Sequence, residues 1–201
     1  MVTYNLAVIT KKIYDSGLLF FTSKTLRVVL EVKKESTLFD LVKKLTQAKI
    51  LTKIERDKYI SRKEKINDFT LANFIYQPSY ISFESALNFY GILSQFPYEI
   101  TSATSKKTRE KVFQDKIFRF THIKRTLFWG YEKKDDFLIA FPEKALLDQL
   151  YLSAKGYKKF DLDEYDFRKI EILRLKKYLN KYPKTRQFKT AIKKLGKYIQ
   201  L

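Results

Sequence analysis

The sequence predicts an α+β protein of two domains that ends in a basic helical tail, and three observations support this expectation. Apolar residues recur at helical spacing along the amino-terminal part of the chain, and two β-prone segments follow them. Four more β-prone stretches lie between helical segments in the middle of the chain. Two amphipathic segments rich in Lys and Arg complete the sequence.

The first domain, residues 1–65, is expected to hold three helices and a hairpin. Spacings of three and four predict a helix over residues 3–16, and Thr22 or Ser23 can cap a second, short helix. A third helix, from about residue 36, has the clearest period, with one apolar face made by Leu38, Leu41, Val42, Leu45 and Ala48. Residues 50–54 and 58–61 indicate a hairpin. This is the layout of a winged helix-turn-helix, with the third helix as reader and the hairpin as wing.

The polar face of the third helix and the wing form the predicted DNA-contacting surface. The major groove admits one α-helix, whose short polar side chains reach base edges and whose lysines reach phosphates. The expected contact residues are Lys24, Lys33, Lys34, Ser36, Thr37, Lys43, Lys44, Gln47, Lys53, Arg56, Lys58 and Arg62. Asp40 lies on the same face, where it would accept from a cytosine amine or hold a lysine in place. The alternative is an ordinary amphipathic helix with a solvated basic face.

Positive charge is concentrated at the two ends of the chain. Residues 168–201 carry 12 Lys and Arg against one acid, and residues 33–63 carry 10 against 4. Residues 64–167 hold 15 charges of each sign, so the ends supply the net charge of +19. Clustered cations release condensed counterions when they neutralise phosphates, which favours a nucleic acid as partner over an acidic protein or a lipid surface.

A linker helix over residues 66–78 is expected to lead into a second domain at 79–201. A helix over residues 82–90 can be capped by Ser82, and Gly91 follows where a left-handed C-cap residue belongs. Strands are expected at 98–104, 116–123, 126–131 and 137–140, and Pro142 starts a helix that runs to residue 152. These elements predict a small antiparallel sheet braced by helices.

The basic tail, from about residue 160 to 201, is expected to form two amphipathic helices joined around Pro183. Their apolar stripes predict docking on the body of the domain, and their cationic faces predict auxiliary phosphate contacts by Arg174, Lys177, Lys189, Lys193 and Lys197. A helix lying on a membrane surface shares this pattern, but the apolar face has no Trp and the chain has no second anchor.

The residue types that catalysis or a metal site needs are sparse. The chain has no Cys, one histidine (His122) and no glycine-rich phosphate loop. The acids within residues 161–166 are better suited to cap or shield the basic helices that follow than to hold Mg²⁺. We therefore expect no enzymatic activity, no metal and no cofactor. Because neither a long apolar run nor a signal peptide is present, we also expect a cytoplasmic protein without a membrane partner.

The second domain contains the segments YISFESALNFYG at 80–91, ITSAT at 100–104 and IAFPEKALLD at 139–148. Their order and separation resemble the AbiEi antitoxins of type IV (abortive infection) toxin–antitoxin systems, and the resemblance covers residues 18–155. It implies a repressor that binds inverted repeats in its own promoter through the winged domain. It also implies an antitoxin whose second domain opposes a nucleotidyltransferase-like toxin. The wing departs from the family pattern, because residues 56–59 lack the usual glycine.

Two alternatives stay open from the sequence. The polar residues of the two family-like helices, Glu84, Ser85, Glu143, Lys144 and Asp148, form either a recognition surface or structural contacts, among them a Lys144–Asp148 pair at spacing i,i+4. The whole chain is either a sequence-specific DNA-binding repressor or a basic module that binds protein or RNA.

Overall fold

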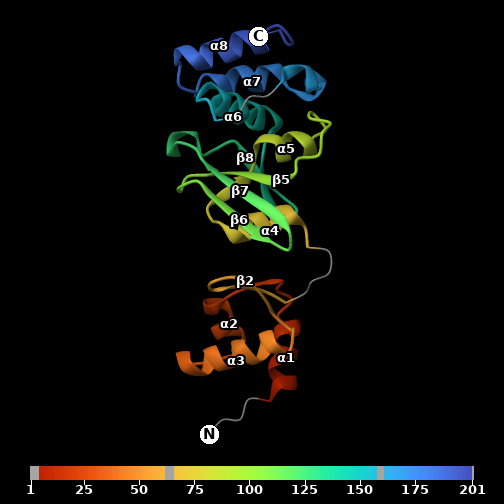
Figure 1. The fold of residues 1–201 in the computed structure, drawn as a ribbon, viewed down its shortest axis with the longest axis vertical. Coiled ribbons are helices and arrows are strands. Elements are labelled where there is room, and N and C mark those ends of the chain that lie inside the picture. The colour runs from red at the N-terminus through yellow and green to blue at the C-terminus, as the bar shows by residue number, and fades with distance from the viewer. Residues whose placement is uncertain (1–4, 62–65, 158–160, 201) are drawn as a thin grey trace. The chain divides into compact units, whose positions relative to one another are not determined.

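The computed structural model describes residues 5–61, 66–157 and 161–200. The chain divides into two compact units, Met1–Asn67 and Asp68–Leu201, and the described residues contain eight α-helices and nine strands (Figure 1). The mixed α+β class is therefore confirmed.

The first unit contains three helices and a three-stranded antiparallel sheet with the strand order β1-β3-β2. Its elements are α1 (Leu6–Asp15), β1 (Phe20–Thr22), α2 (Ser23–Val29), α3 (Glu35–Gln47), β2 (Thr52–Glu55) and β3 (Lys58–Ile60). Strand β1 was not expected from the sequence, because three residues are too few to show alternation. It pairs with β3 and places Phe21 in the core with no exposed surface.

Local chemistry explains where the helices of this unit begin. The Asn5 side chain accepts a hydrogen bond from the backbone N–H of Ala7 at the start of α1, and the Thr22 hydroxyl accepts from that of Thr25 at the start of α2. Helix α3 turns Leu38, Leu41, Val42 and Leu45 into the core, as its period predicted, whereas Ala48, expected on the same face, is the exposed C-cap residue after the helix has ended. Each such leucine stabilises the fold by about 1.5–3 kcal/mol when fully buried.

The second unit is built on a six-stranded sheet with the order β6-β7-β5-β4-β9-β8. The strands are β4 (Ser79–Ile81), β5 (Glu99–Thr104), β6 (Arg109–Phe113), β7 (Lys116–His122), β8 (Tyr131–Lys134) and β9 (Phe137–Ala140). The predicted antiparallel sheet is in fact mixed, because β5 pairs with β7 and β4 with β9 in parallel. Side-chain alternation identifies a strand without fixing the direction of its neighbour.

The strand expected at 126–131 was wrong. Residues Arg125–Leu127 form a short 3-10 helix, and β8 starts only at Tyr131. The aromatic residues that suggested a strand each pack against a different partner. The ring centre of Trp129 lies 4.9 Å from that of Tyr178, with the two rings edge-on, and the ring centre of Phe128 lies 5.1 Å from that of Tyr80.

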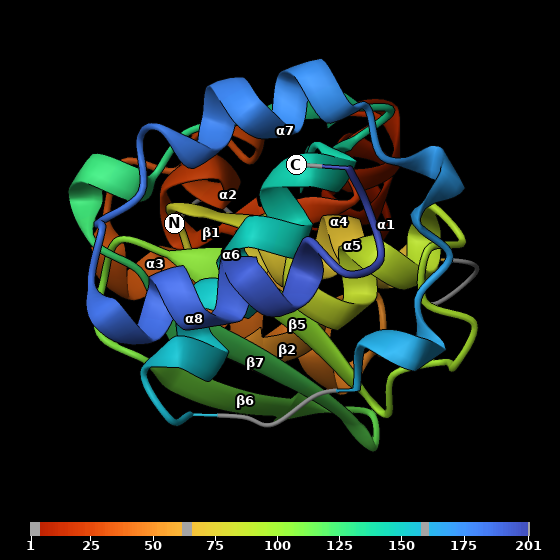
Figure 2. The same cartoon turned by 90° about the horizontal axis from the view of Figure 1, so that it is seen from above.

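Five helices complete the second unit: α4 (Asp68–Ile75), α5 (Phe83–Phe89), α6 (Pro142–Ala154), α7 (Ile172–Leu179) and α8 (Arg186–Leu195). Helix α4 covers one face of the sheet, and α5 and α6 cover the other (Figure 1). Helices α7 and α8 pack over α6 (Figure 2). The helix predicted as a linker over 66–78 thus contributes α4 to the core of the second unit, through Leu71, Ala72 and Ile75.

Candidate nucleic-acid interface

The solvent side of α3 carries the polar residues that its period placed there. Ser36, Asp40, Lys43, Lys44 and Gln47 are all exposed. Within the described part of the chain, none of their side chains takes part in an ion pair or a hydrogen bond. Thr37 is half-buried at the side of the helix. We call these six residues the α3 face; it offers two cations, one carboxylate, one amide and two hydroxyls to a ligand.

The β2–β3 hairpin adds cations to the surface of the first unit. Lys53 of β2 and Arg56 of the turn are exposed. Asp57 takes a left-handed backbone with φ 60° in the turn, within the stretch where this chain has no glycine. The Ser23 hydroxyl donates to the Asp57 carboxylate at 2.6 Å, which ties the start of α2 to the turn. Lys58 differs from the other predicted contacts, because its half-buried amine pairs with Glu55 at 2.6 Å.

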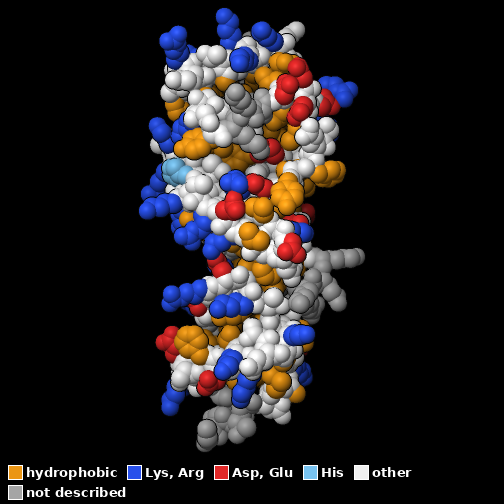
Figure 3. Space-filling view, in the orientation of Figure 1, with side chains coloured by type: hydrophobic (Ala, Val, Ile, Leu, Met, Phe, Trp, Pro, Cys, Tyr) orange, Lys and Arg blue, Asp and Glu red, His pale blue; other side chains and the backbone are white. Residues whose placement is uncertain are grey.

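Three further predicted contacts of the first unit, Lys24, Lys33 and Lys34, are exposed cations outside the body of α3. Lys24 lies on α2, Lys33 precedes α3, and Lys34 occupies the N-cap position of α3 without a capping hydrogen bond. Arg62 lies outside the described residues. Lys and Arg side chains are spread over the visible surface of this unit in Figure 3.

The basic tail forms the two predicted helices and docks by its apolar side. Leu175, Tyr182, Phe188 and Leu195 are buried, whereas Lys177, Lys189, Lys193 and Lys197 are exposed. These four lysines take part in no ion pair among the described residues.

Arg174 is held within the second unit and is therefore a different case from the tail lysines. Its guanidinium pairs with Glu171 at 2.7 Å, lies 3.6 Å from Glu143 and sits 5.2 Å from the centre of the Phe141 ring. A phosphate would have to compete with these contacts.

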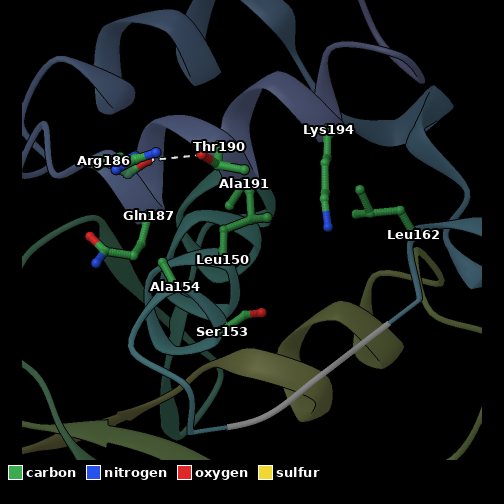
Figure 4. Close-up of a pocket in the computed structure, with 9 residues that line it drawn as sticks. All are labelled: Leu150, Ser153, Ala154, Leu162, Arg186, Gln187, Thr190, Ala191 and Lys194. Atoms are coloured by element: carbon green, nitrogen blue, oxygen red, sulfur yellow. Dashed lines mark hydrogen bonds between the residues drawn. The ribbon is translucent and has the colours of Figure 1, made fainter.

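A hollow of about 520 Å³ lies between α6 and α8 (Figure 4). Leu150 and Ala154 of α6 and Ala191 of α8 contribute apolar surface, and Arg186 and Lys194 of α8 are its cations. The Thr190 hydroxyl donates to the carbonyl of Arg186 at 3.0 Å. The hollow therefore extends the cationic surface of α8.

The polar residues of α6 form a buried network around Asp148. Its carboxylate accepts hydrogen bonds from Tyr80 at 3.0 Å, from Ser82 at 2.9 Å and from Tyr182 at 2.7 Å. It also forms an ion pair with Lys144, and both side chains are fully buried. The i,i+4 pair expected from the sequence is thus confirmed, and a recognition surface that includes Lys144 or Asp148 is excluded.

The surroundings of this network shift the ionisation of its members. Burial lowers the pKa of Lys144, and the neighbouring Asp148 carboxylate opposes that change. Burial, reinforced by the Asp148 charge, raises the pKa of Tyr80 and of Tyr182 well above the ordinary value. At neutral pH the two hydroxyls therefore stay protonated and donate to Asp148.

The other polar residues of the family-like helices are also engaged. Ser82 is the N-cap residue of α5, but its hydroxyl serves Asp148 rather than the helix, contrary to the capping role expected. Ser85 donates to the carbonyl of Glu99 and accepts from the backbone N–H of Thr101. Glu143 accepts from the backbone N–H of Glu171 at the start of α7, so it supports a neighbouring helix. Glu84 accepts from the Gln149 amide at 2.9 Å.

The acids of 161–166 act as caps, but of two short 3-10 turns and not of the basic helices α7 and α8 that they were expected to cap or shield. Asp161 and Asp166 each accept from a backbone N–H of the 3-10 turn that follows, and Asp163 accepts from the Tyr198 hydroxyl. No group of three His, Asp or Glu side chains in the described residues is arranged to hold a metal ion. Within the same residues, no helix has the length and apolar character that crossing a membrane requires.

Sequence reasoning missed one residue that lies beside the α3 face. Phe39 is 62% exposed although it follows the buried Leu38 directly. The signal was present in the sequence, because Phe39 is an aromatic residue outside the apolar period of its helix. Comparison with known proteins adds no assignment, since no protein-family model and no curated protein matches this chain.

Proposed function

We propose that the chain is a DNA-binding transcriptional repressor and antitoxin of a type IV toxin–antitoxin system that acts in the cytoplasm. In this proposal the first unit is a winged helix-turn-helix, α3 enters the major groove and the β2–β3 turn is the wing. The order of three helices followed by a hairpin, which β1 extends into a sheet, supports this assignment.

The observation that carries the proposal is the unpartnered α3 face. A surface helix that needs its lysines for folding would pair them with neighbouring acids, yet Lys43 and Lys44 have no such partner among the described residues. Exposed cations beside short polar side chains match the two tasks of a reading helix, which are to neutralise phosphates and to contact base edges.

The antitoxin half of the proposal rests on the resemblance of residues 80–148 to the AbiEi family. The buried network around Asp148 gives those residues a structural task, because it joins α6 to β4 and to the segment after α7. The second unit would then oppose a nucleotidyltransferase-like toxin through its fold as a whole, and the proposal does not require direct contact between the two proteins.

A mobility shift of the whole chain on its own upstream promoter tests the DNA-binding half. We expect tighter binding to the promoter duplex than to a scrambled duplex of equal length at the same salt concentration. Equal affinity for the two duplexes would contradict a repressor and favour the alternative, a basic module that binds RNA or protein. Co-expression with the toxin encoded beside it tests the second half, and failure to restore growth would contradict it.

A further inference from the structure

The α3 face borders an apolar residue that the fold does not use. Phe39 exposes 62% of its surface, whereas its neighbours Leu38 and Leu41 are buried in the core. Among the described residues its ring has no aromatic or cationic partner. Because an exposed phenyl ring gains nothing from water, this side chain contributes little to folding.

Phe39 lies at the edge of the surface proposed to read DNA, next to Lys43. Ser36, Phe39 and Lys43 follow one another at spacings of three and four, so they lie along one side of α3. Phe39 is the fifth residue of the helix, and the first turns of a reading helix are the part that contacts base edges.

Base-pair edges in the major groove are polar except for one group, the C5 methyl of thymine. For an exposed apolar side chain on a reading helix, that methyl is therefore the apolar partner that a base-pair edge offers. We propose that Phe39 is a specificity-determining residue that recognises thymine in the bound duplex by packing against its C5 methyl group. This inference rests on the proposed DNA-binding function and adds to it a base preference that the cations of the face cannot supply.

Deoxyuridine provides the test, because it differs from thymidine only by that methyl group and keeps every hydrogen-bonding atom. Each thymine of the promoter site would be replaced in turn by deoxyuridine, and the dissociation constant of the whole chain would be measured at fixed salt. We expect a loss of about fourfold at one thymine of each half-site, the value of one buried methyl group, and little change elsewhere.

Variants assign the effect to the ring. Phe39→Ala should bind the thymine and the deoxyuridine sites equally, and Phe39→Leu should keep part of the discrimination. Val28→Ala is the matched control, because Val28 is another exposed apolar residue of the first unit, at 71%, but lies on α2. That control should discriminate as the unaltered chain does. Thermal unfolding of all three variants should be unchanged, because neither side chain is buried.

The outcomes distinguish a failure of the proposed role of Phe39 from a failure of the proposed repressor function. Preference for the promoter with no deoxyuridine effect at any position overturns the role of Phe39 and leaves the repressor intact. A deoxyuridine effect that persists in Phe39→Ala also overturns it, because another residue then contacts the methyl. Absence of any preference for the promoter removes the proposed function itself, and with it this inference.

Discussion

At the residue scale, the second unit depends on a charge pair that water does not reach. Sequence spacing was enough to predict that Lys144 and Asp148 pair, because i and i+4 lie on one helix face. It could not predict the hydroxyls of Tyr80 and Tyr182, which approach Asp148 from positions 68 and 34 residues away. Local periodicity carries no information on such contacts, so the buried character of the pair became clear only from the fold.

Breaking this pair should destabilise the second unit strongly. Lys144→Met leaves a buried carboxylate without its counter-charge, and we expect a loss of about 3–5 kcal/mol in the free energy of unfolding. Asp148→Asn should cost a similar amount, whereas the double variant should cost clearly less than the sum. Urea unfolding followed by the fluorescence of Trp129, the one tryptophan of the chain, reports on this unit.

The exposed Lys133→Met change is the control and should stay within about 0.5 kcal/mol. Additive effects of Lys144→Met and Asp148→Asn would show that the two side chains do not act as a pair.

Alkaline pH should weaken the same network. Tyr182 has a raised pKa when folded, so its contribution is complete below its unfolded pKa near 10.0 and is lost as pH rises further. Lys144, with a lowered pKa, changes stability in the opposite direction only up to its unfolded value of 10.5. The stability difference between the unaltered chain and Tyr182→Phe should therefore shrink above pH 10, by at most about 1.4 kcal/mol per pH unit.

Urea unfolding of both proteins between pH 8 and pH 11.5 measures this difference. A difference that stays constant across the range would contradict a raised pKa for Tyr182.

At the element scale, helices were more predictable than strands. Helix α3 shows its full period over 13 residues and was placed correctly, and so were α5, α6 and the two tail helices. Strands β1 and β4, each of three residues, and β6, whose side chains are mostly exposed, were missed, because neither a very short nor a mostly polar segment shows a clear alternation. The α3 face was predictable for the same reason as α3 itself: residues opposite an apolar stripe must face solvent.

Substitutions on α3 should separate affinity from sequence preference. Lys43→Ala should weaken binding to promoter and scrambled duplexes alike, because a phosphate contact carries no sequence information. Ser36→Ala or Gln47→Ala should reduce the preference for the promoter by about 1–3 kcal/mol for each hydrogen bond to a base edge that the change removes. Lys11→Ala, an exposed lysine of α1, is the matched control and should leave both affinities unchanged. Competition binding at fixed salt measures all four proteins, and a Lys43 effect confined to the promoter would contradict a phosphate contact.

At the scale of the whole molecule, the charge distribution acquires a structural explanation. The neutral middle of the sequence supplies the sheet of the second unit, whereas the basic tail covers α6 with its apolar side and leaves its lysines in solvent. Removing the tail would delete the buried side chains of Leu175, Tyr182 and Leu195 and expose the surface of α6 that the tail covers. We expect this loss to unfold the unit. The tail's part in DNA binding has to be tested with the fold kept intact.

Charge substitution on the tail meets that requirement. Lys189, Lys193 and Lys197 are exposed, and their change to Gln removes three charges without touching the core. If each contacts a phosphate, the slope of log affinity against log salt should become shallower by about 0.9 per lysine. The same substitution at Lys107, Lys124 and Lys133, exposed residues of the neutral middle, removes equal charge and should change the slope little. Both triple variants lose three positive charges, but only the tail variant loses the proposed phosphate contacts. Equal slopes for the two variants would therefore show that the tail lysines act only through the net charge of the protein.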